Sequence, residues 1–131
     1  MKRIMFFVRD SLVANLLGAG VEMVLEDNVT VLDVIVKADE MIRKKGAFPI
    51  KEYKSLLHMV YNPETDKFYK QVGIHAHTKP GEFHNIKDNI RQELLNGMTI
   101  TIIPSAGCIT EFEEPLGYEE FIKALSSYKR I

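Results

Sequence analysis

The hydrophobic pattern of this chain consists of short apolar blocks separated by turn residues. Residues 3–8 and 98–103 are rich in β-branched, aromatic and other apolar side chains, which is typical of central strands buried on both faces. Residues 21–25 place three apolar side chains on one side of an extended backbone, and this alternation predicts a half-buried strand. The pattern therefore predicts two strands near the start of the chain and one near residue 100.

The middle of the chain carries a hairpin signal. Residues 56–61 and 67–74 flank an Asn-Pro-Glu-Thr-Asp segment at 62–66, whose proline and short polar side chains favour a turn. Residues 77–83 contain Pro-Gly and predict a loop. Residues 85–94 have an N-capping asparagine and apolar positions four apart, which predicts a short helical stretch.

The clearest helix is predicted over residues 30–45, where apolar side chains recur with the spacing of one helical face. Thr30 and Asp33 resemble a capping box, and Gly46 follows three cationic residues, as expected at a helix C-terminus. A second, C-terminal helix is predicted from a compact apolar stripe formed by Tyr118, Phe121, Ile122 and Leu125.

These elements predict the α+β class, with one principal helix covering one face of a mixed sheet and an appended C-terminal helix. The strongly apolar first and last strands are expected to be parallel neighbours at the centre of the sheet. That arrangement is the β-grasp, or ubiquitin-like, fold. We therefore predict a β-grasp domain over residues 1–107 and a C-terminal extension over residues 108–131. The helix of this extension is expected to pack on the same domain, and the alternative is that it docks on a partner.

Composition narrows the classes of partner. The chain has 131 residues, of which 46% are hydrophobic and 27% charged, and these values are typical of a folded globular domain. Seventeen basic and eighteen acidic residues give a net charge of -1, so no overall attraction to nucleic acid or to an anionic membrane is expected. A single cysteine excludes an internal disulfide, and the reducing cytoplasm is the expected setting.

Three segments, residues 2–8, 30–35 and 94–107, carry a resemblance to the ubiquitin-like sulfur-carrier family. This family includes the small subunit of molybdopterin synthase and the sulfur carrier of the thiamine pathway. The last segment resembles the family's leucine, glycine turn, hydrophobic strand, proline and small-residue glycine tail. The resemblance implies a β-grasp fold and, as partner, a larger enzyme or an E1-like adenylating enzyme.

The chain departs from that family at its C-terminus. Family carriers end in a free Gly-Gly whose carboxylate is adenylated and converted to a thiocarboxylate, whereas Gly107 is followed by twenty-four more residues. Residues 47–93 are also longer than the family's middle segment. Carrier chemistry at Gly107 would therefore require removal of the C-terminal extension.

The tail after the last strand contains the candidate partner-binding residues. The family resemblance implies that Gly107 becomes the carrier C-terminus if the extension is removed. The five candidate residues are Pro104, Ser105, Ala106, Gly107 and Cys108. No neighbouring residue supplies a base for Cys108, so a small half-buried residue is favoured over a nucleophile.

The histidines form a second candidate site. His75 and His77 are two residues apart and would face the same side of a strand, and His84 can return from the loop as a third nitrogen ligand. Glu82 is a candidate fourth ligand for a divalent metal. The alternative is a solvent-exposed strand end, which is favoured because no established zinc motif is present. His58 is predicted to lie on the face of the central hairpin.

Three functions remain open from the sequence. No complete catalytic set and no cofactor are predicted, which favours a non-catalytic protein that docks on a protein partner. The first alternative is a sulfur carrier activated at Gly107 after C-terminal processing. The second is a small metal-dependent enzyme built on the histidines.

Overall fold

The structure is a computed structural model of the chain. It describes residues 1–10, 13, 17, 20–46, 53–104 and 112–128.

The main sheet has five strands in the order β2-β1-β7-β5-β6. Their bounds are Lys2–Val8 for β1, Val21–Leu25 for β2, Gly73–His77 for β5, Phe83–His84 for β6 and Met98–Ile103 for β7. The first strand β1 pairs with β2 in antiparallel and with β7 in parallel orientation. Adjacent, parallel first and last strands were expected from the sequence, and this prediction is confirmed.

Helix α2 spans Val31–Lys44 and confirms the helix predicted over residues 30–45. Its start is fixed by Asp33, whose carboxylate accepts a hydrogen bond of 2.9 Å from the Thr30 N–H, as in a capping box. Its end is followed by Gly46 at φ +68°, a left-handed conformation that glycine adopts without steric cost. The predicted apolar face is fully buried and consists of Val31, Ile35, Ala38 and Ile42.

The predicted strand over residues 56–61 is wrong, because Leu56–Val60 form a short helix, α3. The first N–H groups of a helix need acceptors from outside it. The side chain of Ser55 accepts from the His58 N–H at 3.0 Å. The Asp39 carboxylate on α2 accepts from the Leu56 N–H at 2.6 Å and from the Leu57 N–H at 3.1 Å. A carboxylate distant in the sequence thus favours helix over strand here.

The predicted strand over residues 67–74 is also divided. Two-residue strands, β3 (Tyr61–Asn62) and β4 (Lys67–Phe68), pair in a separate small sheet, while β5 begins at Gly73 and joins the main sheet. A turn separates β4 from β5 and buries Tyr69 and Val72 completely. The predicted turn between the two hairpin strands is present, but the strands on either side of it are shorter than expected.

The predicted helical stretch over residues 85–94 is not a helix, since its backbone forms separate turns. In the first of them the side chain of Asn85 accepts a hydrogen bond of 3.2 Å from the Asp88 N–H. The apolar positions of the segment are nevertheless buried, and they are Ile86, Ile90 and Leu94. The predicted loop over residues 77–83 ends in β6, which forms a hairpin with β5.

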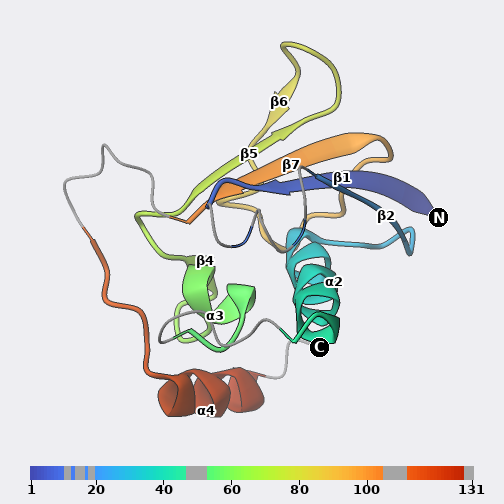
Figure 1. Ribbon diagram of the computed structural model, residues 1–131. Coiled ribbons are helices and arrows are strands. Elements are labelled where there is room, and N and C mark those ends of the chain that lie inside the picture. The colour runs from blue at the N-terminus through green and yellow to red at the C-terminus, as the bar shows by residue number, and fades with distance from the viewer. Residues whose placement is uncertain (11–12, 14–16, 18–19, 47–52, 105–111, 129–131) are drawn as a thin grey trace.

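The three helices that the structure describes lie on one side of the five-stranded sheet (Figure 1). Helix α4, Tyr118–Tyr128, lies beyond α3 as seen from the sheet (Figure 1). We call residues 112–128 the C-terminal arm. This α+β arrangement, with α2 under a mixed sheet and parallel central strands, is the β-grasp predicted from the sequence.

None of the described helices has the length and apolar character needed to cross a membrane.

Replacing Ile35 by alanine is expected to lower the free energy of unfolding by about 2–5 kcal/mol, because its fully buried side chain leaves a cavity beneath the sheet. The matched control is Val36→Ala on the same helix, since Val36 is 44% exposed and should lose less than about 1 kcal/mol. Urea unfolding followed by circular dichroism measures both. Equal losses would contradict the assigned face of α2.

The Asp39 carboxyl should make stability depend on pH. Burial raises the pKa of Asp39 from its ordinary value of 3.8 to about 6, against the opposing effect of its two backbone hydrogen bonds. Because the folded state then binds the proton more tightly than the unfolded state, this contribution is fully present below pH 3.8 and lost as the pH rises through 6.

Relative to an Asp39→Asn variant, the wild-type protein should therefore lose on the order of 3 kcal/mol between pH 4 and pH 7. Urea unfolding over that pH range measures the difference. Glu40→Gln is the control, because the neighbouring Glu40 is exposed on the same helix. Parallel pH curves for wild-type and Asp39→Asn protein would contradict the proposed titration.

Candidate functional site

The side of the main sheet opposite the helices, which we call the open face, presents an ordered grid of side chains. The strand register aligns two rows across β1, β7 and β5. One row contains Met5, Thr99 and His77, and the other contains Phe7, Thr101 and His75. The grid arises because side chains alternate between the two faces of a strand.

Burial differs between the two faces of the central strands. The helix-covered face buries Ile4, Phe6, Val8, Met98, Ile100 and Ile102. The side chains between them, Met5 and Phe7 on β1 and Thr99 and Thr101 on β7, are only half-buried. The expectation that both strands are buried on both faces is therefore wrong for the open face.

A shallow depression of about 580 Å³ lies on the open face, and we call it the β7 trough. It is lined by Met5, Phe7, Val8, Arg9, His77, Thr99 and Thr101. The two short threonine side chains form its floor between the larger side chains of β1 and β5. The Phe7 ring lies over Gly20, the residue just before β2. Any side chain at residue 20 would overlap this ring, so glycine leaves the space that the ring occupies.

The predicted set of three histidine ligands is not brought together. His75 and His77 lie on the open face, whereas His84 pairs directly with Ala76, whose side chain is buried on the other face. Residues paired across strands share a face, so the His84 imidazole lies on the opposite side of the sheet. Within the described ranges, no group of three or more His, Cys, Asp or Glu side chains could hold a metal ion.

Glu82 takes part in a local contact at the β5–β6 hairpin. Its carboxylate accepts a hydrogen bond of 3.0 Å from the Thr78 hydroxyl. The same hydroxyl lies 3.3 Å from Nε2 of His84. These contacts stabilise the hairpin that adds β6 to the sheet.

His58 lies on α3 and is buried, so its predicted position on a hairpin face is wrong. Its Nδ1 accepts from the Lys54 N–H at 3.2 Å. Nε2 therefore carries the proton and donates to the carbonyl oxygen of Leu116 in the C-terminal arm at 2.7 Å. Its ring also contacts three aromatic rings, those of Tyr53, Tyr118 and Phe121.

The start of the C-terminal arm is held by several hydrogen bonds. Gln71 exchanges two with the backbone of Glu113, at 2.9 and 3.1 Å, while the Glu113 carboxylate accepts from the Lys70 N–H at 3.0 Å. The Leu116 N–H donates to the Tyr69 hydroxyl oxygen at 3.0 Å. Together with His58, these contacts fix the arm against the segment between α3 and β5.

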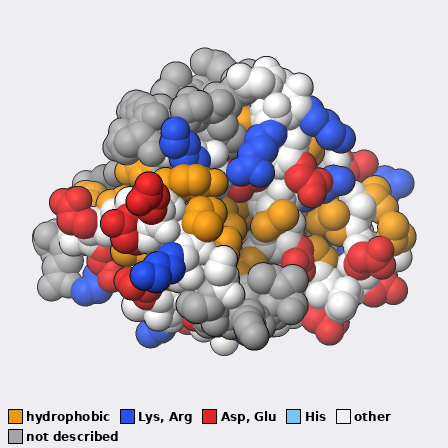
Figure 2. Space-filling model, turned by 90° about the horizontal axis from the view of Figure 1, so that it is seen from below, with side chains coloured by type: hydrophobic (Ala, Val, Ile, Leu, Met, Phe, Trp, Pro, Cys, Tyr) orange, Lys and Arg blue, Asp and Glu red, His pale blue; other side chains and the backbone are white. Residues whose placement is uncertain are grey.

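Helix α4 packs on α3 through Phe121, which is 2% exposed. The Phe121 and His58 ring centroids are 5.0 Å apart. The neighbouring Ile122 is 40% exposed. Figure 2 views the molecule from the side of α4 and shows hydrophobic side chains at the surface among acidic and basic ones.

Of the predicted partner-binding residues, Pro104 is half-buried at the end of β7. Ser105, Ala106, Gly107 and Cys108 lie outside the described residues. The boundary predicted between residues 107 and 108 lies there as well. The roles assigned to this tail therefore stay predictions.

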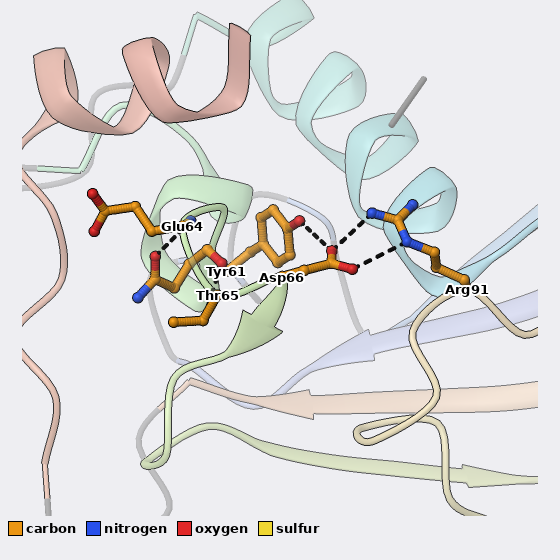
Figure 3. Close-up of polar contacts among 6 residues, drawn as sticks. Tyr61, Glu64, Thr65, Asp66 and Arg91 are labelled. Carbon is orange, nitrogen blue, oxygen red and sulfur yellow. Dashed lines mark hydrogen bonds and ion pairs between the residues drawn. The ribbon is translucent and has the colours of Figure 1, made fainter. Parts of the chain in front are cut away.

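A second polar cluster joins the β3–β4 turn to the segment before β7 (Figure 3). The Asp66 carboxylate accepts a hydrogen bond of 2.6 Å from the Tyr61 hydroxyl and two, at 3.1 and 2.9 Å, from the Arg91 guanidinium. Asp66 has φ +56°, a conformation that aspartate tolerates better than most residues. Its carboxylate is thus used to fix the turn, so we assign this cluster a structural role.

Sequence reasoning missed the β7 trough. The alternation of threonine with Met98, Ile100 and Ile102 was the available signal for an uncovered face. Arg9 follows β1 directly, but a single arginine after a strand carries no specific signal.

Phe121→Ala is expected to lower the free energy of unfolding by about 3–5 kcal/mol, because a buried ring is removed from the contact between α4 and α3. Ile122→Ala on the same helix is the control and should cost less than about 1 kcal/mol. Thermal and urea unfolding measure both. A small loss for Phe121→Ala would contradict a stabilising role for the arm.

Comparisons with known proteins give two solved structures. No protein-family model matches the sequence, and no curated protein matches it. The crystal structure of small archaeal modifier protein 1 of H. volcanii is 15% identical, covers 80% of this chain and 99% of its own, and has a TM-score of 0.49. A structure of SAMP1 from Haloferax volcanii is 17% identical, covers 80% and 97%, and has a TM-score of 0.46. The β-grasp assignment therefore rests on the strand order and helix position described above.

Proposed function

We propose that this chain is a non-catalytic, ubiquitin-like β-grasp protein that docks on a protein partner through the open face of its sheet. The observation that carries this proposal is the exposure of large apolar side chains at both ends of that face. Val24 on β2 is 53% exposed, and Phe83 on β6 is 70% exposed. Protein interaction sites typically combine exposed apolar side chains with polar groups, and this face carries Met5 and Phe7 beside its two threonines.

The titration behaviour of the described residues gives no support to an enzyme. The raised pKa of Asp39 has a structural cause, because burial raises it where the carboxylate caps α3. Burial also raises the pKa of Tyr69, whose hydroxyl holds the C-terminal arm. Groups whose pKa is shifted because they hold the fold together are weak candidates for catalysis.

The sulfur-carrier alternative requires Gly107 to become a C-terminus. The arm beyond it contacts the domain through His58, Tyr69 and Gln71. Removal of the extension would therefore require cleavage of the chain and also loss of these contacts. The metal-enzyme alternative lacks support because His75 and His84 belong to opposite faces of the sheet.

The proposal is tested by a double variant, Val24→Ser with Phe83→Ser, in capture of proteins from the native host. The matched control is Val36→Ser with Ile122→Ser, because both residues are exposed but lie on helices on the other side of the sheet. The open-face variant should retain about tenfold less partner, and the control should retain the wild-type amount.

Unfolding midpoints of both variants should match the wild-type value, which excludes misfolding as the cause. The proposal fails if the wild-type protein retains no partner. It also fails if the open-face variant retains as much as the control.

A further inference from the structure

The β7 trough offers hydrogen-bond donors that are unused within the described protein. The Arg9 guanidinium, the hydroxyls of Thr99 and Thr101 and the His77 imidazole all line it. In the ranges that the structure describes, none of these groups has a hydrogen-bond or ion-pair partner. Water must therefore satisfy these donors until a ligand replaces it.

The charge of the trough is positive. Arg9 is the charged residue in its lining, and no carboxylate is among the described residues that line it. Glu22 on the same face lies 3.8 Å from Arg3, with which it forms an ion pair. Asp10, next to Arg9 in the sequence, accepts a hydrogen bond of 3.2 Å from the Val13 N–H. The trough is thus complementary to a negatively charged group.

The cation and the most distant apolar side chain occupy different ends. Arg9 follows β1 beyond Phe7, so it lies at one end of the trough. Met5 and His77 lie in one row at the other end, where the His77 ring also contacts the ring of Phe83 at a centroid distance of 6.0 Å. A ligand lying along β7 would meet a cation first and apolar surface next.

The shape of the trough favours an extended peptide over a small molecule. Pockets for small molecules typically enclose about 70–90% of their ligand, whereas this depression is shallow and lies on one face of a sheet. Thr99 and Thr101 are two residues apart on one strand, which corresponds to about 6.6 Å. Alternate side chains of an extended peptide have nearly the same spacing, so one can point at each threonine.

We propose that the β7 trough binds an extended acidic segment of the protein partner, with one carboxylate on the Arg9 guanidinium and alternate polar side chains on the threonine hydroxyls. Apolar side chains of the same segment pack on Met5, Phe7 and Phe83. This inference rests on the proposed docking function and adds the chemistry of the partner. Arginine is suited to this role because its planar guanidinium can donate two hydrogen bonds to one carboxylate.

The test uses two synthetic ten-residue peptides with leucine, serine and glycine in the same order. One peptide contains three glutamates, and the other contains three glutamines at the same positions. Each is titrated into the full chain, and binding is followed by the backbone amide signals in nuclear magnetic resonance spectra. The glutamate peptide should shift the signals of residues 5, 7, 9, 77, 99 and 101. The glutamine peptide should bind about tenfold more weakly.

The matched variants are Arg9→Gln and Arg43→Gln, since Arg43 is an exposed arginine on α2. Arg9→Gln should weaken binding of the glutamate peptide about tenfold, and Arg43→Gln should leave it unchanged. Unchanged binding by Arg9→Gln, equal binding of the two peptides or signal shifts outside the trough would each overturn the inference.

Partner capture separates this inference from the proposed function. If the Val24 and Phe83 double variant loses the partner while Arg9→Gln retains the wild-type amount, docking on the open face stands and the acidic segment is refuted. If both lose it, the acidic segment is supported. If the double variant loses nothing, the proposed function itself fails.

Discussion

The parallel pairing of β1 with β7 is the contact on which the rest of the structure depends. Ile4 pairs with Met98 and Val8 with Ile102, so the two ends of the β-grasp domain form the centre of one sheet. The chain between them must then leave this sheet and return to it. Helix α2 does so by burying one side against it, while β2 and β5 extend the sheet on either side.

The same pairing creates the open face. Once the register places Phe6 beside Ile100 in the core, the intervening side chains must point to the other side of the sheet. Thr99 and Thr101 thereby lie between larger residues of β1 and β5 and form the floor of the β7 trough. Core and interaction surface are thus two consequences of one register, and a shift by one residue would exchange them.

The sequence predicted the elements whose determinants are local. Residues 21–25 and 98–103 alternate or cluster over a few positions, and α2 has its own capping residues and apolar stripe. Residues 56–60 were assigned incorrectly because Asp39, on another helix, caps α3. The open face was missed because Met5 and Phe7 are as apolar as core residues, and only tertiary packing determines which side of a strand the helices cover.

If the chain acts through its open face with the C-terminal arm in place, the arm must remain covalently attached in the cell. Top-down mass spectrometry of the protein isolated from its native host measures this directly. We predict a chain in which Gly107 is still joined to Cys108 and residues 112–128 are retained. A species ending at Gly107, especially one heavier by the exchange of one oxygen for sulfur, would contradict the docking function and support the sulfur carrier.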